Sequence, residues 1–274
     1  MDLLRTVGWC PVGKLLSAHE VEDVHRHFLK KDMRLPNQEA FPTNRREAIP
    51  IGTNIGEYEA ADVVEAPHLG RIANHPDVLA RVAGYLEVPP TIQYYTSWWS
   101  FAGRKAPKEA QMYHFDRACY RFLKLFVFLT DVTMGSGPHC YVEGSGRHAE
   151  WQKRLDEFRR TDPQKADHIW SKLQVHRKED AEVEACFGLE NIRHLCGRAG
   201  EAFLVNTAGF HKGILPKSSD RLVFQALYTM LPTIKHGAPR IPCAGYYQSI
   251  AHPERVDPAY LRYVNRLIVD DTTD

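Results

Sequence analysis

The first clear pattern along the chain is that of an amphipathic helix. Val21 and Val24 recur at helical spacing in a stretch whose other positions are largely polar. Ser17, followed three residues later by Glu20, forms the signature of a capping box, in which each side chain hydrogen-bonds to the other residue's backbone N–H. The pattern therefore predicts a helix over residues 18–30.

A second helix is predicted over residues 74–89, where apolar positions again recur every three or four residues. Asn74 is the expected N-cap, Pro76 suits a first turn that needs no backbone N–H, and Pro89 ends the helix. Because it contains both patterns, the part of the chain over about residues 1–90 is predicted to be helical.

From residue 91 onward the pattern becomes that of a β-sheet. Aromatic and β-branched residues dominate segments of strand length, and residues typical of turns separate these segments. The segments cover residues 91–101, 121–132, 201–213 and 221–231. The sequence therefore predicts a core of strands over about residues 91–232.

A charged stretch over about residues 147–195 interrupts these strands. Its scattered apolar residues have the spacing of surface helices, so we expect a helical insert there. Helices followed by strands, with helices inserted among them, favour one α+β domain over residues 1–274 with a mostly β core.

The charge balance narrows the class of partner. The 274 residues include 35 basic and 34 acidic side chains, a net charge of +1, so electrostatics give no reason to expect nucleic acid or a membrane as a partner. No run approaches the 18 apolar residues of a membrane span, and the six cysteines show no C-x-x-C spacing. These features are typical of a cytoplasmic protein that acts on a small molecule, and they leave its oligomeric state unknown.

His114 and Asp116, separated by one residue, stand just before the second predicted strand. Residues two apart on an extended chain point to the same face, so this imidazole and this carboxylate can bind one cation together. The 2-His-1-carboxylate set of non-haem Fe(II) enzymes needs a third ligand, and His211 is the strongest candidate because it follows a predicted strand and a glycine. Another His-x-Asp triplet begins at His75, but it marks the start of a predicted helix.

Lys124 interrupts an apolar run in the strand predicted over residues 121–132. A buried ammonium without a partner is costly, so we expect an anion beside it. That anion is either a bound ligand or an acidic side chain, unless the strand end frays and the lysine reaches solvent. Gln111, three residues before His114, is either a second polar group facing the site or an ordinary glutamine at a strand edge.

Two segments of the chain closely resemble the phytanoyl-CoA dioxygenase family of Fe(II)- and 2-oxoglutarate-dependent oxygenases. They are QMYHFDRACYRFLKLFVFLTDVTMGSGPHCYVEGSGRH and NTAGFHKGILPKSSDRLVFQALY, and the resemblance extends over about residues 90–232. It implies a double-stranded β-helix, which is a cupin-like jelly-roll of two facing sheets, with flanking and inserted helices.

Carried over to this chain, the resemblance implies that His114, Asp116 and His211 hold Fe(II). It also implies that Arg221 binds the distal carboxylate of 2-oxoglutarate, a role that suits a planar guanidinium because it can bind a carboxylate with two parallel hydrogen bonds. The lysine and the glutamine described above are further candidates for cosubstrate contacts. Departures from the family pattern include Gly213, which stands where some members use a serine near the cosubstrate.

The activity implied is hydroxylation of an unactivated C–H bond of a small molecule, with O2 as oxidant and 2-oxoglutarate converted to succinate and CO2. Related halogenases have a small residue in place of the carboxylate, so Asp116 argues against halogenation. Desaturation, ring formation and epimerisation use the same ligands and stay open. The alternatives are a cupin-like metal-dependent hydrolase or isomerase, which has no need of Arg221, and a non-catalytic sensor of metal or 2-oxoglutarate.

Four further residues are candidates for substrate contacts. Arg117 follows Asp116 and either lies at the pocket mouth or is a surface arginine. Trp98 and Trp99 point to opposite faces of an extended strand, so at most one of them lines the pocket. His139 either contacts substrate or is a turn histidine without function.

Overall fold

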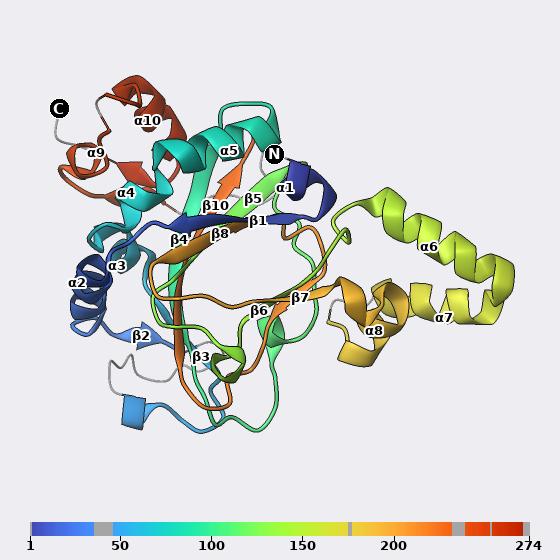
Figure 1. The fold of residues 1–274 in the computed structure, drawn as a ribbon. Coiled ribbons are helices and arrows are strands. Elements are labelled where there is room, and N and C mark those ends of the chain that lie inside the picture. The colour runs from blue at the N-terminus through green and yellow to red at the C-terminus, as the bar shows by residue number, and fades with distance from the viewer. Residues whose placement is uncertain (1, 36–45, 175–176, 232–238, 253, 271–274) are drawn as a thin grey trace.

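The computed structural model describes residues 2–35, 46–174, 177–231, 239–252 and 254–270. Two antiparallel sheets face each other at its centre (Figure 1). The larger has the strand order β1-β8-β5-β10-β4-β3-β2, and the smaller has the order β7-β6-β9. The strands of the larger sheet are β1 (Trp9–Lys14), β2 (Met33–Arg34), β3 (Ile55–Tyr58), β4 (Thr91–Ser100), β5 (Phe122–Phe128), β8 (Glu201–Val205) and β10 (Arg221–Thr229). Those of the smaller sheet are β6 (His139–Val142), β7 (Ile192–Leu195) and β9 (His211–Gly213).

Helices from both ends of the chain cover the outer face of the larger sheet, while a pair of inserted helices projects from the other side as an arm (Figure 1). The covering helices are α2 (Ala18–Phe28), α3 (Ala60–Glu65), α4 (Leu69–Ala73), α5 (Pro76–Leu86), α9 (Tyr246–Ser249) and α10 (Pro258–Asn265). The others are α1 (Asp2–Thr6), α8 (Asp180–Phe187) and the two helices of the arm, α6 (His148–Thr161) and α7 (Pro163–Gln174). Short elements complete the chain: η1 (Arg46–Ala48), η2 (Glu109–Gln111), η3 (Met134–Ser136), η4 (Leu189–Asn191), and the parallel pair β11 (Ile241–Pro242) and β12 (Val269–Asp270).

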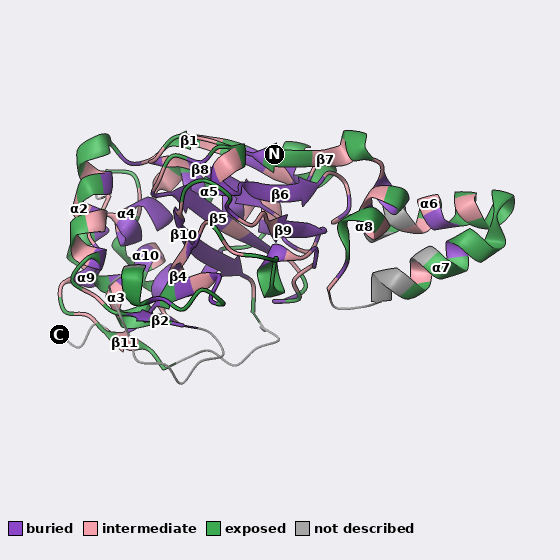
Figure 2. Cartoon of the chain, turned by 90° about the horizontal axis from the view of Figure 1, so that it is seen from below, coloured by how far each residue is buried: buried purple, intermediate pink, exposed green. Residues whose placement is uncertain are grey.

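Strand β10 lies between β5 and β4, and all nine of its residues are buried. Its side chains alternate between two environments. Leu222 and Phe224 pack into the core under the helices, while Arg221, Val223 and Gln225 line a cavity between the sheets. Figure 2 shows the same contrast at the scale of the molecule, with buried residues concentrated in the strands and exposed ones along the arm.

The helix predicted over residues 18–30 is confirmed as α2, with the Ser17–Glu20 capping box in place. The prediction of a helical part over residues 1–90 is wrong in one respect, because β1, β2 and β3 lie within it and join the larger sheet. These strands are short. β1 also contains a proline, a glycine and an irregularity in its register, so its sequence lacks the alternation of apolar and polar residues that predicts a strand.

The second predicted helix is α5, but its N-cap is His75, whose side chain accepts a hydrogen bond from the backbone N–H of Asp77. Asn74 instead forms the C-cap of α4 and is fully buried. An asparagine at a junction of two helices satisfies the sequence signal for either role.

The segment predicted as one strand over residues 201–213 forms β8 and β9, which belong to different sheets. A turn over residues 206–209 carries the chain across, and the side chain of Asn206 accepts a hydrogen bond from the backbone N–H of Ala208 there. The insert predicted over residues 147–195 is helical only as far as η4, because Ile192–Leu195 is strand β7.

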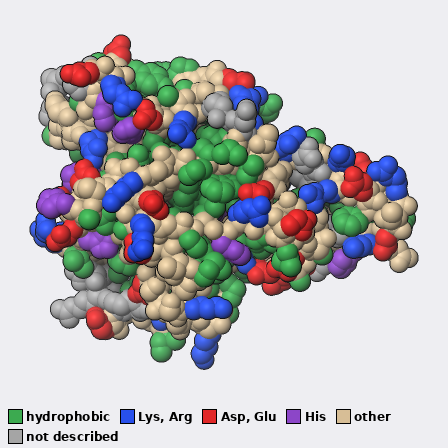
Figure 3. Space-filling view, viewed as in Figure 1, with side chains coloured by type: hydrophobic (Ala, Val, Ile, Leu, Met, Phe, Trp, Pro, Cys, Tyr) green, Lys and Arg blue, Asp and Glu red, His purple; other side chains and the backbone are tan. Residues whose placement is uncertain are grey.

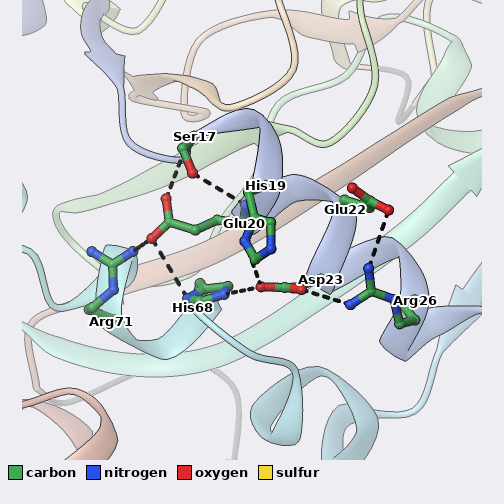
Figure 4. Close-up of polar contacts among 8 residues, drawn as sticks. All are labelled: Ser17, His19, Glu20, Glu22, Asp23, Arg26, His68 and Arg71. Atoms are coloured by element: carbon green, nitrogen blue, oxygen red, sulfur yellow. Dashed lines mark hydrogen bonds and ion pairs between the residues drawn. The ribbon is translucent and has the colours of Figure 1, made fainter.

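Polar contacts on the surface join α2 to α4 (Figure 4). Glu20 accepts hydrogen bonds from the backbone N–H of Ser17 and from the Arg71 guanidinium. Nε2 of His68 lies 3.1 Å from a carboxylate oxygen of Asp23.

Figure 3 shows basic and acidic side chains scattered over one face of the molecule and over the arm, in line with a net charge near zero. Within the described residues, no helix has both the length and the apolar character needed to cross a membrane.

A buried polar cluster ties the C-terminal helices to the rest of the domain. Asn265 on α10 donates to Asn74 Oδ1 at 2.8 Å and accepts a hydrogen bond from Tyr246 of α9 at 3.0 Å. Tyr95 of β4 is 2.9 Å from Tyr246 through the two hydroxyl oxygens. Both asparagines are fully buried, so these hydrogen bonds fix the positions of α4, α9, α10 and β4 relative to one another.

Asn265→Ala should lower the free energy of unfolding by about 1 to 3 kcal/mol, because it leaves the buried Oδ1 of Asn74 without its donor. Urea unfolding measures the change. Gln248→Ala, which removes an exposed amide from α9, is the matched control and should stay within about 0.5 kcal/mol of the wild type. Equal stability of the two variants would contradict the role of the cluster.

Candidate metal centre and its cavity

The two candidate histidines lie on neighbouring extended segments that come from distant parts of the chain. Their backbones form a pair of hydrogen bonds, from His114 N–H to His211 C=O at 2.9 Å and from His211 N–H to His114 C=O at 2.8 Å. Asp116 is fixed in the same way, because its N–H donates to Thr207 C=O at 2.7 Å. The segment around His114 is extended as expected, although it forms an isolated bridge and not a regular strand.

Side chains of His114, Asp116 and His211 converge on one point. Each offers one ligand atom, and these atoms all lie within 4.8 Å of one another. His211 Nε2 is 3.5 Å from one carboxylate oxygen of Asp116, and His114 Nε2 is 4.0 Å from the other. Among the residues that the structure describes, no other group of three or more histidine, cysteine or acidic side chains has this arrangement.

Hydrogen bonds to the backbone decide which ring nitrogens face that point. Nδ1 of His114 lies 2.9 Å from Met112 C=O, and Nδ1 of His211 lies 2.9 Å from Gly209 C=O. A carbonyl oxygen only accepts, so each Nδ1 carries the proton and each Nε2 keeps a free lone pair. Both rings are therefore oriented as metal-binding histidines are.

The charge states of the three groups also suit a cation. Burial lowers the pKa of His114, and the neighbouring His211 lowers it further, so the ring is neutral at pH 7. Burial likewise lowers the pKa of His211. Burial alone would raise the pKa of Asp116, but Lys124 and His211 outweigh it and hold this pKa below its usual range. Two neutral imidazoles and one ionised carboxylate result, the state in which such side chains bind metal.

Lys124 Nζ lies 2.7 Å from Asp116 Oδ2. This is the acidic partner that the sequence left as one of its alternatives. Burial alone would lower the pKa of Lys124, but contacts with Tyr94 and Asp116 outweigh it and raise the pKa. The lysine therefore stays charged and holds one carboxylate oxygen of Asp116 in place.

A cavity of about 240 Å³ lies between the two sheets beside the triad. Strands β3, β4, β5, β8 and β10 contribute to it from the larger sheet, and β6 and β9 contribute from the smaller. His114, His211 and Lys124 lie in its wall together with the apolar rings of Phe126 and Phe203. The cavity connects the triad with the residues at the start of β10.

Arg221 lies in the wall of this cavity and is 4% exposed. Its Nη2 donates to Ser100 Oγ at 3.1 Å, while its buried Nε has no hydrogen-bond partner and no ion pair joins it to a carboxylate among the described residues. Burial lowers its pKa to about 10, so the guanidinium is still charged at pH 7. Gly213 leaves room beside it, because a Cβ there would come within 2.9 Å of Nη2. A buried charge of this kind calls for an anion in the cavity.

Gln111 belongs to η2 and not to a strand edge, and it is 3% exposed. Its Oε1 accepts a hydrogen bond from Asn54 Nδ2 at 2.6 Å. Its buried Nε2 has no partner within the described part of the chain, and the residue lines the same cavity as Arg221. Of the two alternatives for Gln111, the structure therefore favours a side chain that faces the site.

The two tryptophans separate as the strand alternation predicts. Trp98 lines the cavity, whereas Trp99 packs against the core and donates from Nε1 to Tyr58 Oη at 3.0 Å. Trp99 is therefore not a pocket residue. Arg117 is also outside the cavity wall: it is exposed, with its guanidinium 5.1 Å from the ring centre of Phe115. It corresponds to the surface alternative.

His139 lies on β6, so the alternative of a turn histidine is wrong. It is buried in the cavity wall, and the centre of its ring lies 5.4 Å from the centre of the His211 ring. Its buried Nε2 has no hydrogen-bond partner among the described residues, and burial lowers its pKa well below the usual value. A neutral ring with one unsatisfied nitrogen faces the space next to the triad.

Sequence reasoning missed many residues of the cavity wall, among them Tyr94, Thr96, Ser100 and Gln225. The first three lie on the same face of β4 as Trp98, at two-residue intervals, and Gln225 lies four residues after Arg221 on β10. Their positions follow from the alternation of a strand. Once one residue of each strand is assigned to the cavity, this alternation predicts that the residues two and four positions away on the same strand also line it.

Comparison with solved structures shows the same fold in several proteins. HygX from Streptomyces hygroscopicus, solved with nickel, 2-oxoglutarate and hygromycin B, is 15% identical, with a TM-score of 0.54 over 84% of this chain and 86% of HygX. SnoK, described as a non-haem α-ketoglutarate-dependent carbocyclase from nogalamycin biosynthesis, is 17% identical, with a TM-score of 0.55 over 83% of this chain and 81% of SnoK. The epimerase SnoN of the same biosynthesis is 18% identical, with a TM-score of 0.52 over 83% and 80% of the two chains. The expected double-stranded β-helix is thereby confirmed.

No curated protein matches the chain significantly. A family model does: the model described as phytanoyl-CoA dioxygenase (PhyH) matches residues 4–221, which is most of the chain. The matched region contains the complete triad and ends at Arg221. The chain therefore belongs to the phytanoyl-CoA dioxygenase family of Fe(II)- and 2-oxoglutarate-dependent oxygenases.

Proposed function

We propose that this protein hydroxylates an unactivated C–H bond of a small-molecule substrate, with Fe(II) and 2-oxoglutarate as cofactor and cosubstrate. The observation that carries the proposal is the buried, still charged Arg221 at the wall of the cavity that also contains the triad histidines. A triad alone would suit many metal enzymes. A guanidinium without an acidic partner among the described residues, in the same cavity, suits a dicarboxylate.

The residues present fit both groups. His114, Asp116 and His211 offer two lone pairs and a carboxylate to a divalent metal of intermediate softness. Arg221 and the unpartnered Nε2 of Gln111 offer donors to a carboxylate. When bound, iron and 2-oxoglutarate supply the oxidising chemistry, in which O2 is consumed and succinate and CO2 are formed.

The remaining cavity residues have distinct tasks in this proposal. Lys124 holds Asp116 through its 2.7 Å contact, and it serves the cosubstrate only indirectly. Phe126 and Phe203 exclude water from one wall of the space. Trp98 and His139 face the same space and are the candidates for substrate contacts.

Two classes of alternative have sharply different requirements. A hydrolase or isomerase built on the same triad has no use for a dicarboxylate anchor, so it leaves Arg221 unexplained. A non-catalytic sensor would bind 2-oxoglutarate without converting it. Within the oxygenase reading, the solved structures of similar fold include a carbocyclase and an epimerase, and product analysis separates these outcomes from hydroxylation.

His114→Ala, Asp116→Ala and His211→Ala should each abolish the conversion of 2-oxoglutarate to succinate and weaken Fe(II) binding, because each removes one of three ligands. Anaerobic Fe(II) titration and succinate assays measure the two effects. His75→Ala is the matched control: it also removes the histidine of a His-x-Asp triplet, but one that caps α5, and it should keep both properties. Normal turnover in any of the three triad variants would rule out the assigned ligands.

Arg221→Gln should weaken 2-oxoglutarate binding by about 30- to 150-fold, which corresponds to the loss of about 2 to 3 kcal/mol from a charge-assisted contact. Fe(II) affinity should stay unchanged because the three ligands are untouched. Anaerobic titration of 2-oxoglutarate into the Fe(II) protein, followed by the metal-to-ligand absorption band, gives both values.

Arg117→Gln, an exposed arginine outside the cavity, is the control and should change 2-oxoglutarate affinity less than about twofold. Lys124→Met should weaken 2-oxoglutarate binding less than Arg221→Gln does. The reverse order would make Lys124 the anchor. If the wild type gives neither the absorption band nor succinate, the hydrolase or isomerase alternative is favoured. The band without succinate favours the non-catalytic sensor.

A further inference from the structure

The triad segments have a second face, which points away from the cavity. His114 and Asp116 alternate along the chain with Tyr113 and Phe115, and His211 follows Phe210. Tyr113, Phe115 and Phe210 pack together in a separate hydrophobic cluster on the outer side of the smaller sheet. The aromatic rings behind the triad are therefore immediate neighbours, along the chain, of the three metal ligands.

The helical insert covers this outer face. The same cluster includes Leu155 of α6 and Val183 and Phe187 of α8. The ring centres of Phe187 and Phe210 are 5.3 Å apart. Lys212, the residue after His211, is bound by Asp180 of α8. The insert is thus packed directly against both segments that carry the ligands.

Lys178 lies at the centre of this contact and is 1% exposed. Its backbone N–H donates to Tyr113 C=O at 2.9 Å. Its ammonium lies 5.0 Å from the ring centre of Phe115 and 4.9 Å from that of Phe210, and these rings meet edge to face with 5.5 Å between their centres. Burial lowers the pKa of Lys178 to about 8, so the side chain is still mostly protonated at pH 7.

We propose that Lys178 is a positioning residue for the metal centre: its ammonium, held by the rings of Phe115 and Phe210, fixes the spacing of the two ligand-bearing segments. The inference rests on the proposed function, because it presupposes that the triad binds a divalent metal. Its physical basis is that a cation attracts the faces of both rings at once. One ring stands between His114 and Asp116, and the other precedes His211, so a shift of either ring moves a ligand.

Two other roles for Lys178 predict different results. If it acted only as a nearby positive charge, its removal would strengthen the binding of a divalent cation, because like charges repel. If it only filled space, a side chain of similar length would leave metal affinity unchanged. A positioning role alone predicts weaker metal binding in a protein that stays folded.

The test is Lys178→Met, which keeps the length of the side chain and removes its charge. Co(II) is the probe, because its visible absorption bands report the coordination geometry and its binding can be titrated under air in the absence of 2-oxoglutarate. We expect Co(II) affinity to fall by about 5- to 30-fold, the effect of losing two cation–π contacts, with altered absorption bands at saturation. Far-UV circular dichroism shows whether the fold is kept.

Lys165→Met is the matched control, because Lys165 lies 4.9 Å from the ring centre of Phe158 in the arm, away from the triad segments. It should leave both the affinity and the spectrum unchanged. Phe210→Leu provides a second variant in case Lys178→Met does not fold, and it should weaken Co(II) binding in the same direction.

Unchanged or tighter Co(II) binding in folded Lys178→Met, with an unchanged spectrum, would overturn the positioning role while leaving the triad intact. Failure of the wild type to bind Co(II) would overturn the metal site and this inference with it. The two failures are therefore distinguishable in one set of titrations.

Discussion

The site depends on one pair of backbone hydrogen bonds, those exchanged by His114 and His211. They join two short segments that lie 97 positions apart in the sequence, and neither segment has a long strand to hold it. Side-chain orientation follows from this pairing, because both rings then turn their Nδ1 protons to carbonyls of their own segments. A small distortion of the backbone would move both imidazoles together, which is why the packing on the outer face matters for the inner one.

Two buried cations line the same cavity, and their charges are compensated in different ways. Lys124 is neutralised by Asp116 within the protein, whereas Arg221 is held by a serine hydroxyl that supplies no charge. An ion pair inside the protein is complete without a ligand, but an unpaired guanidinium is costly until an anion arrives. In the proposed function this contrast separates a lysine that holds a ligand side chain from an arginine that binds an anion. The sequence alone could not tell the two cations apart.

The strand pattern predicted the central elements well, because β4, β5 and β10 are long and rich in aromatic and β-branched residues. It also placed Arg221 at the start of its strand and separated Trp98 from Trp99. It failed where elements are short or are defined by distant partners: β1 to β3, β7, and the crossing from β8 to β9. Lys178 shows the limit most clearly, since nothing near it in the sequence indicates that two rings from remote segments surround it.

The position of β1 in the larger sheet has a consequence for how the chain folds. Within the described residues this edge strand pairs with β8 alone, so Trp9 must wait for Val205 before this edge of the sheet is complete. Contacts of such high sequence separation are slow to form, because a long loop must close before any pairing energy is gained. During synthesis the N-terminal strand leaves the ribosome long before its partner exists. The pairing of β1 with β8 is therefore expected to form late in folding, and the unpaired β1 is exposed to aggregation until then.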